Sequence, residues 1–258
     1  MQIHFEKYQG TGNDFVMVDN RTKHLDAYSL PISAICDRKF GVGADGVILI
    51  EPHDTLDFNM IYFNPDGSQS FCGNGSRCAV AFAKSLGLIN QNTTFLSTDG
   101  QHEASISEGL VALKMHDVNE VKNLGDAYEL NTGSPHFIRF VKNVTQIDLI
   151  PEAQKVRYNS TYKSGGINVN FVEQLPNALK MRTYERGVED ETLSCGTGVT
   201  AAVLAHAHHN QVSGKNVNIE VHVEGGVLHV QFTRDGNKFT DIYLIGPAKK
   251  TFEGRIDI

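Results

Sequence analysis

The sequence predicts an α+β fold made of two pseudo-symmetric domains, each a rolled antiparallel or mixed β-sheet around a central α-helix. Three observations support this prediction: a repeated cysteine–glycine segment, a strand-like run before each copy, and an apolar helical pattern after each copy. An internal repeat bears on the whole fold because each copy must form the same supersecondary unit. The 258 residues are enough for two domains of ordinary size.

The repeat is clearest around two cysteines. Residues 72–80 read Cys-Gly-Asn-Gly-Ser-Arg-Cys-Ala-Val, and residues 195–203 read Cys-Gly-Thr-Gly-Val-Thr-Ala-Ala-Val. Cysteine, both glycines, alanine and valine coincide at an offset of 123 residues. Two further matches lie upstream at offsets of 122 and 121: residues 61–64 with 183–186, and residues 11–13 with 132–134. Three matches in the same order at a nearly constant offset indicate a duplication.

The local patterns agree between the two copies. Strand-like runs at residues 58–63 and 179–184 precede the cysteines, and helical patterns at residues 77–86 and 199–208 follow them. Both helical patterns are apolar nearly all round, which is typical of buried helices. Most of the remaining chain alternates as strands do, with glycine-rich turns between several of the runs.

The weakly patterned segment at residues 116–126 is the expected junction between the halves. We therefore expect an N-terminal half of residues 1–115 with residues 247–258, which contains Cys72. The expected C-terminal half is residues 116–246, which contains Cys195.

Composition and charge exclude several classes of protein. The net charge is −7, and no run of Lys and Arg is present, which disfavours nucleic acid as a partner. No apolar stretch approaches the roughly 20 residues of a membrane helix, so we expect no membrane association. The first residues show neither the basic nor the apolar region of a secretory signal. With four cysteines and no such signal, we expect a cytoplasmic protein with reduced thiols.

A cysteine at the start of a helix has a distinctive chemistry. It lies beside backbone N–H groups that lack partners within the helix, near the positive end of the helix dipole. This setting lowers the pKa of a cysteine from its usual value of about 8.5. The glycines after each cysteine leave room for a carboxylate to reach the N–H groups. Two such helix starts predict a cofactor-independent amino-acid epimerase, in which one thiolate removes the α-hydrogen and the opposite thiol supplies a proton.

Core packing is the competing interpretation of each cysteine, and for a single buried cysteine it is the more common one. The duplication changes this, because packing gives no reason to place a cysteine at the same helix start in both halves. We therefore assign Cys72 and Cys195 to catalysis. Cys78 lies within the predicted helix, where the second half has Ala201, and we predict that it and Cys36 are core residues.

Together these segments resemble the diaminopimelate epimerase family. The likeness runs from residue 3 to about residue 250 and rests on five motifs: Thr-Gly-Asn-Asp-Phe at 11–15, Asn-Pro-Asp-Gly-Ser at 64–68, Cys-Gly-Asn-Gly-Ser-Arg-Cys at 72–78, Tyr-Glu-Arg-Gly at 184–187, and Cys-Gly-Thr-Gly at 195–198. The resemblance implies interconversion of LL- and meso-diaminopimelate without pyridoxal phosphate, on the route to lysine and the bacterial cell wall. It also implies two similar domains and a homodimer, with an amino acid as the small-molecule substrate.

The resemblance assigns roles by position. It gives a catalytic set of Cys72, Cys195, His136 and Glu185. It gives a set of positions whose backbone N–H groups hold the reacting carboxylate: Gly73, Asn74, Gly196 and Thr197. It gives a set of other substrate-binding positions: Asn13, Asn64, Asn168, Glu185 and Arg186. A guanidinium can grip a distal carboxylate with two parallel bonds, which suits Arg186 to that role.

Two positions depart from the family pattern. Ser134 stands where many members have the asparagine of an Asn-Pro-His motif, and it offers one hydroxyl in place of an amide. Gly46 stands where some members have glutamine. We expect no metal, since His206, His208 and His209 lack the spacing of a metal site and fit a solvated helix end. We expect no cofactor either, because the two-thiol mechanism needs none.

Two alternatives remain open. Another two-cysteine racemase, acting on histidine, proline or hydroxyproline, shares the same thiol pair. Proline-type substrates would leave Glu185 and Arg186 without a partner, whereas a substrate with a second charged head would not. A binding protein without catalysis is the other alternative, although binding needs only the N–H groups and not a second cysteine.

Overall fold

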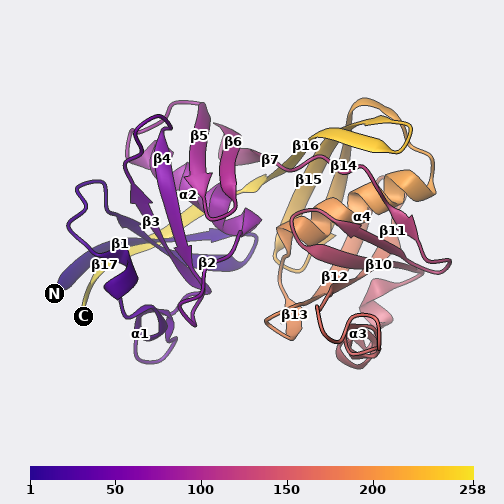
Figure 1. Cartoon of the computed structure of the whole chain (residues 1–258), viewed down its shortest axis with the longest axis horizontal. Helices are drawn as coiled ribbons and strands as arrows, with labels where there is room; N and C mark the ends of the chain where they lie inside the picture. The colour runs from indigo at the N-terminus through magenta and orange to yellow at the C-terminus, as the bar shows by residue number, and fades with distance from the viewer. The chain divides into compact units, whose positions relative to one another are not determined.

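The computed structural model describes all 258 residues, which form two compact units (Figure 1). The first unit comprises Met1–Leu113 with Gly246–Ile258, and the second comprises Lys114–Ile245. The C-terminal strand belongs to the first unit because β17 (Lys249–Asp257) pairs antiparallel with β1 (Gln2–Gly10).

The first unit has an eight-stranded mixed sheet in the order β17-β1-β2-β3-β4-β5-β6-β7. The pairs β2–β3 and β4–β5 are parallel, and all others are antiparallel. The strands after β1 are β2 (Asn13–Asp19), β3 (Gly46–Glu51), β4 (Phe58–Phe63), β5 (Asn92–Ser97), β6 (Gly100–Ser107) and β7 (Leu110–Lys114).

The second unit has the same arrangement, in the order β8-β9-β10-β11-β12-β14-β15-β16. Its parallel pairs, β10–β11 and β12–β14, occupy the same places in the order as those of the first unit. Its strands are β8 (Lys122–Asn123), β9 (Tyr128–Asn131), β10 (Pro135–Val141), β11 (Asn168–Gln174), β12 (Ala178–Glu185), β13 (Asp190–Thr192, paired with the end of β12), β14 (Gly214–Val223), β15 (Gly226–Asp235) and β16 (Lys238–Pro247). The common pairing pattern confirms the predicted α+β fold with an internal duplication.

A buried helix runs along the inside of each sheet. α2 (Gly73–Ser85) contacts β1, β2, β3, β4 and β6, and α4 (Gly196–His209) contacts β9 to β12, β14 and β15. Eleven residues of each helix are buried, which explains why their sequences are apolar nearly all round. Figure 1 shows α2 and α4 each enclosed by the strands of its own unit.

A short helix covers the outer face of each sheet. α1 (Ile32–Cys36) packs on β2 and β3, and α3 (Leu149–Arg157) packs on β11. Strand β3 is therefore covered on both faces, and its run of apolar residues is continuous rather than alternating. Single 3-10 turns at Ala27–Ser29 and Val144–Gln146 precede α1 and α3. No helix has both the length and the apolar character needed to cross a membrane.

The chain after α1 turns back tightly over the end of that helix, which gives a test of the fold. A Cβ atom at Gly41 would lie 2.0 Å from the carbonyl oxygen of Ala34 and 2.7 Å from that of Ile35. Because both are backbone atoms, we expect Gly41→Ala to lower the free energy of unfolding by about 2–3 kcal/mol in a urea titration. Gly165→Ala is the matched control, since its Cβ would meet nothing within 4 Å. Equal losses in the two variants would contradict this packing.

Candidate active site

Both candidate cysteines are N-cap residues of the buried helices. Cys72 precedes α2 with φ −136° and ψ 110°, and Cys195 precedes α4 with φ −121° and ψ 106°. The apolar pattern predicts helix starts at residues 77 and 199. In the structure α2 begins four residues earlier, at Gly73, and α4 begins three residues earlier, at Gly196. The early turns contain glycine and small polar residues, which carry no apolar periodicity. As a result each cysteine lies directly at the unsatisfied N–H groups of a helix start.

In the first unit, the structure brings together Cys72, Asn13 and Asn74. The Cys72 sulfur accepts a hydrogen bond from the backbone N–H of Gly75 at 3.4 Å. Its thiol donates to Asn13 Oδ1 at 3.7 Å, and Asn74 Nδ2 donates to the same oxygen at 3.3 Å. Asn74 is buried and Cys72 is half-buried. Three of the predicted residues therefore form one cluster at the start of α2.

A charged network that the sequence analysis missed supports Asn13. Asp45 accepts from the Asn13 side-chain amide at 2.5 Å, and Arg38 bridges Asp45 and Asp14 with contacts of 2.7 Å to each. Lys7, which is buried, pairs with Asp14 at 2.8 Å. Burial raises the pKa of Asp14, but hydrogen bonds from Arg38 and Lys7 outweigh it and lower that pKa to about 2.

Asn64 is not tied to this cluster. Its Oδ1 accepts from the Tyr62 hydroxyl at 2.8 Å. Its Nδ2 donates to Ser68 Oγ at 3.0 Å and Ser70 Oγ at 3.1 Å. These bonds hold Asn64 within its own loop, directly after β4.

In the second unit, a hydrogen-bonded chain leads from β11 to Cys195. Asn170 Nδ2 lies 3.2 Å from His136 Nδ1, and His136 Nε2 lies 2.9 Å from Thr197 Oγ1. Thr197 Oγ1 in turn lies 3.5 Å from Cys195 Sγ. Thr183 donates to Asn170 Oδ1 at 2.9 Å, which fixes the orientation of the Asn170 amide. All five side chains are buried.

The direction of each bond in this chain follows from the Asn170 amide. Because its NH₂ group donates to Nδ1 of His136, the ring proton belongs on Nε2 and is donated to the Thr197 oxygen. The hydroxyl proton of Thr197 is then available to the Cys195 sulfur. Burial, with a smaller effect from the charge of Arg186, lowers the pKa of His136 to about 3. His136 is therefore neutral at physiological pH.

The remaining predicted residues of the second unit lie around the end of β12. Asn168 donates to Ser134 Oγ at 2.9 Å and accepts from the backbone N–H of Arg186 at 2.9 Å. The Arg186 guanidinium also reaches Ser134 Oγ at 3.4 Å and the carbonyl of Gly165 at 3.2 Å. Ser134 thus contacts both predicted substrate-binding side chains, while the Arg186 side chain is exposed.

Glu185 lies next to Arg186 and accepts a hydrogen bond from the Thr192 hydroxyl at 2.8 Å. Two further carboxylates within residues 185–191, which are rich in Glu and Asp, form ion pairs that the sequence alone did not indicate. Glu189 pairs with Arg157 at 2.7 Å, and Glu191 pairs with Arg182 at 2.6 Å. These pairs hold the loop that leads from β12 to Cys195.

The sequence predicted that the histidines at the end of α4 are solvated. In the structure they also pack against aromatic side chains. His206 and His209 pack against the ring of Phe140, and His209 accepts from or donates to the Tyr128 hydroxyl at 2.7 Å. No three His, Cys, Asp or Glu side chains come together as a metal site.

The two helix starts have the same backbone but different surroundings. A Cβ at Gly75 would meet Ile48 and Phe15, whereas a Cβ at Gly198 would meet Asn170 at 2.7 Å and His136 at 3.3 Å. The first turn of α2 therefore packs against apolar side chains at Gly75, whereas the first turn of α4 packs against a polar network at Gly198.

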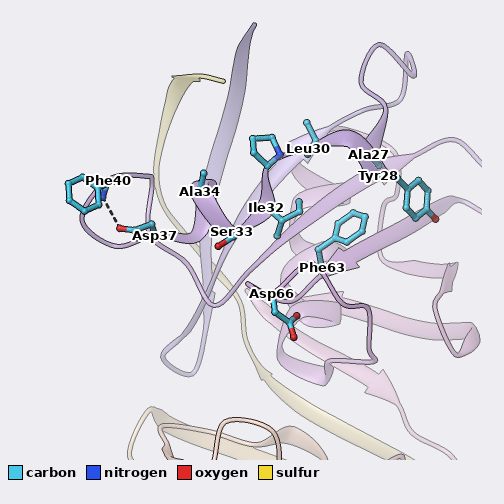
Figure 2. Close-up of a pocket in the computed structure, with 12 residues that line it drawn as sticks. Ala27, Tyr28, Leu30, Ile32, Ser33, Ala34, Asp37, Phe40, Phe63 and Asp66 are labelled. Carbon is cyan, nitrogen blue, oxygen red and sulfur yellow. Dashed lines mark hydrogen bonds between the residues drawn. The ribbon is translucent and has the colours of Figure 1, made fainter.

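A separate hollow in the first unit holds neither cysteine. It measures about 650 Å³ and is lined by residues of α1 and by Tyr28, Phe40, Phe63 and Asp66 (Figure 2). Of its lining residues, Phe63 directly precedes the predicted site residue Asn64 in the sequence, and Asp66 belongs to the same loop as Asn64. The helix starts, and not this hollow, are the candidate site.

The sequence matches the family model described as diaminopimelate epimerase twice, over residues 5–130 and 128–251. It is 49% identical over 255 residues to a diaminopimelate epimerase of Flavobacterium psychrophilum, covering 97% of this chain and 98% of the relative. It is 37% identical over 276 residues to that of Aquifex aeolicus, covering 98% of each chain.

Solved structures with low sequence identity share the fold. A phenazine biosynthesis protein of the PhzF family from Bacillus anthracis has a TM-score of 0.80 at 16% identity and covers 100% of both chains. A hydroxyproline epimerase from Agrobacterium vitis has a TM-score of 0.69 at 14% identity, covering 99% of this chain and 91% of that one. The two matches to the family model follow the two halves of the duplication, and with the curated relatives they show that the chain belongs to the diaminopimelate epimerase family.

Proposed function

We propose that this chain interconverts LL- and meso-diaminopimelate, with Cys72 and Cys195 as its two proton-transferring groups and no cofactor. The observation that carries the proposal is the position of each cysteine as the N-cap of a buried helix in a duplicated fold. Family membership supports the substrate. We include in the proposal the homodimer and the cytoplasmic location that the resemblance implies. The four cysteines form no disulfide, which fits a reducing compartment.

The helix starts supply the electrostatic part of the mechanism. Removal of an α-hydrogen places negative charge on the α-carbon and its carboxylate. Backbone N–H groups at Gly73, Asn74, Gly196 and Thr197 point out of the helix starts by the geometry of any helix. Fixed dipoles of this kind stabilise a developing anion by several kcal/mol when water is excluded. The reacting carboxylate is therefore the group that these N–H donors bind in the proposed mechanism.

The proton transfers balance between the two sulfurs. One cysteine, as thiolate, takes the α-hydrogen, and the electron pair of the C–H bond stays on the substrate. The other cysteine, as thiol, gives its proton to the opposite face of the same carbon. At the end of the reaction the first cysteine is a thiol and the second is a thiolate, so the reverse reaction uses the same groups in exchanged roles.

The end of β12 supports a substrate with a second charged head. Arg186 offers a guanidinium to a distal carboxylate, and Glu185 offers a carboxylate to an ammonium group. Ser134 and Asn168 hold Arg186 from its side chain and from its backbone, respectively. A proline or hydroxyproline substrate has no second head for these groups to bind, so diaminopimelate fits this chain better than the alternative substrates of other two-cysteine racemases.

Isotope exchange tests the reaction and its substrate. In D₂O without added cofactor, LL-diaminopimelate should gain deuterium at an α-carbon as the meso form appears, measured by NMR and mass spectrometry. Histidine, proline and hydroxyproline should exchange at least about a hundredfold more slowly, because losing a bidentate charged contact costs roughly 3 kcal/mol. Faster exchange of any of these three would assign the chain to another racemase. Binding of LL-diaminopimelate without any exchange would identify a binding protein.

Replacing either cysteine tests the two-thiol mechanism. Cys72→Ala and Cys195→Ala should each lower kcat by about 10²–10⁴ or more, since each removes a general acid or base. Cys36→Ala is the matched control, because Cys36 lies in α1 and burial raises the pKa of its thiol to about 11. The control should keep wild-type kcat in the same assay. Substantial epimerisation by either catalytic variant would refute the mechanism.

The neutral state of His136 has a measurable effect on stability. Burial lowers its pKa to about 3, so between that value and about 6.5 the unfolded chain binds a proton that the folded chain does not. Stability contributed by this group is thus lost as the pH falls, by up to about 1.4 kcal/mol per pH unit. His136→Gln should make the decline in unfolding free energy from about pH 6 to pH 4.5 shallower by about 1 kcal/mol per pH unit in urea titrations. Equal slopes would mean that His136 is not buried in neutral form.

A further inference from the structure

Two buried polar side chains, His136 on β10 and Asn170 on β11, lie against the start of α4. Each is 0% exposed. A Cβ at Gly198 would lie 2.7 Å from Asn170 Oδ1 and 3.3 Å from His136 Cε1, so the first turn of the helix packs directly on this pair. Because burial of polar groups costs free energy unless they are hydrogen-bonded, the pair is expected to be fully engaged.

The duplication provides an internal comparison for this pair. In the first unit, a Cβ at Gly75 would meet Ile48 and Phe15 instead. Those two side chains come from the parallel strands β2 and β3, as His136 and Asn170 come from the parallel strands β10 and β11. The same backbone therefore forms over an apolar pair, and the fold alone does not require polar side chains at these places. The polar pair is specific to the second unit.

The contacts of Asn170 fix which way its amide points. Its Oδ1 accepts from the Thr183 hydroxyl at 2.9 Å. Its Nδ2 lies 3.1 Å from the carbonyl oxygen of Phe137, 3.2 Å from Nδ1 of His136 and 3.4 Å from the carbonyl oxygen of Asn168. The reversed amide would place Oδ1 against two carbonyl oxygens, which repel it. The two amide hydrogens therefore serve the two nearer acceptors, one of which is His136 Nδ1.

This donation determines the hydrogen bonds that follow. Since His136 Nδ1 accepts, the proton of the neutral ring is on Nε2 and is donated to Thr197 Oγ1 at 2.9 Å. The Thr197 hydroxyl cannot donate back to the ring, and its proton is directed at Cys195 Sγ, 3.5 Å away. Thr132 holds the same residue from its backbone, by donating to the carbonyl oxygen of Thr197 at 2.8 Å. A hydroxyl that donates to sulfur stabilises the thiolate relative to the thiol.

The first unit offers its sulfur an acceptor instead. The Cys72 thiol donates to Asn13 Oδ1 at 3.7 Å. Asn13 Nδ2 donates to Asp45 at 2.5 Å, which leaves the amide oxygen toward the thiol. An acceptor beside a thiol favours its protonated form, whereas a donor favours the thiolate. The side chains on the strands thus distinguish two sulfurs that occupy the same place in the fold.

The ionisable groups on the strands that pack against α4 do not replace this effect. Arg186 is the charge that reaches His136, and together with burial it favours the neutral ring. Lys180 lies near the start of β12, and Lys215 and Asp235 lie beside Arg234 at the far end of α4. Most others have partners other than His136 and Cys195: Tyr128 with His209, Glu129 with Tyr162, Arg139 with Asp126, Glu173 with the backbone of Val144, Arg182 with Glu191, Tyr184 with Tyr158, Glu185 with Thr192, Glu220 with His222 and His229, and Arg234 with the carbonyl of Ala207.

We propose that Asn170 is a positioning residue: it holds the proton of neutral His136 on Nε2, so that the Thr197 hydroxyl donates to the Cys195 sulfur and stabilises its thiolate. The role of Cys195 in proton transfer rests on the proposed epimerase function. The position of the ring proton and the ionisation of the thiol do not, and both can be measured without substrate.

Nuclear magnetic resonance of the full chain, labelled with ¹³Cβ-cysteine and ¹⁵N-histidine, tests the end of this chain of bonds. In the wild-type protein the ¹⁵N signals of His136 should show a protonated Nε2 and an unprotonated Nδ1. Thr197→Val keeps the volume and the backbone N–H but removes the hydroxyl. It should raise the midpoint of Cys195 ionisation by about one pH unit, a tenfold loss of thiolate below the midpoint. Thr197→Ser keeps the hydroxyl and should keep the midpoint.

The chain supplies its own controls for this titration. Thr132→Val is the matched variant, because it removes a hydroxyl that contacts Thr197 at the carbonyl and not at the sulfur. It should leave the Cys195 midpoint unchanged. Burial raises the pKa of Cys36 to about 11 and that of Cys78 to about 12, so neither should titrate below about pH 10.

Asn170→Asp tests Asn170 itself. It keeps the volume but offers His136 an acceptor in place of a donor, so the neutral ring should carry its proton on Nδ1. Nε2 then accepts from the Thr197 hydroxyl, and the Cys195 midpoint should rise as it does in Thr197→Val. The double variant should rise little further, because both changes remove the same hydrogen bond. Additive rises would show that the new carboxylate acts on the sulfur directly, and they would overturn the proposal.

Two further results would also overturn it: a wild-type His136 with its proton on Nδ1, and an unchanged Cys195 midpoint in either folded single variant. If Asn170→Asp does not fold, the wild-type ring and Thr197→Val decide, and a proton on Nε2 with a raised midpoint supports the proposal. A chain that shows these shifts but does not exchange diaminopimelate would refute the proposed function and leave the role of Asn170 intact.

Discussion

Both candidate sites depend on the unsatisfied N–H groups at the start of a helix buried inside a sheet. Such groups need partners, and at a buried helix start water cannot supply them freely. In α2 the Cys72 sulfur accepts one of them, whereas in α4 the Cys195 sulfur faces the Thr197 hydroxyl instead. The first turns are glycine-rich, so a carboxylate can reach the backbone N–H groups that have no partner within the helix. The constraint that shapes the core thereby also creates an anion site beside each thiol.

The fold was largely predictable because its evidence is local and repeated. The strands before each cysteine and the helices after it follow from periodicity, and the duplication follows from sequence identity between the halves. The predicted starts of α2 and α4 lie a few residues after the observed starts. Periodicity is carried by apolar side chains, and the first turns of both helices have almost no apolar side chains. The short β13 was also missed, since three residues among acidic neighbours give no strand pattern.

The candidate site was predictable in its residue types and much less in its contacts. The cysteines and Asn13 were found from motifs, but Asp45 was not, because only the parallel pairing of β2 with β3 brings residues 32 positions apart together. Asn170 was missed for the same reason, since its partner His136 lies 34 residues earlier on the adjoining strand. One local signal was present: Asn168 and Asn170 alternate with Val169 and Phe171 in the first half of β11, which indicates polar side chains on one face of that strand.

Duplication gives two similar helix starts, but a reaction that inverts one carbon needs them in different protonation states. The structure shows that the two thiols have different neighbours. The Cys72 thiol donates to the amide oxygen of Asn13, which Asn74 also contacts. The Cys195 sulfur instead faces the Thr197 hydroxyl, which neutral His136 and Asn170 hold in place. The halves have therefore kept their common backbone and diverged in the polar groups around each sulfur.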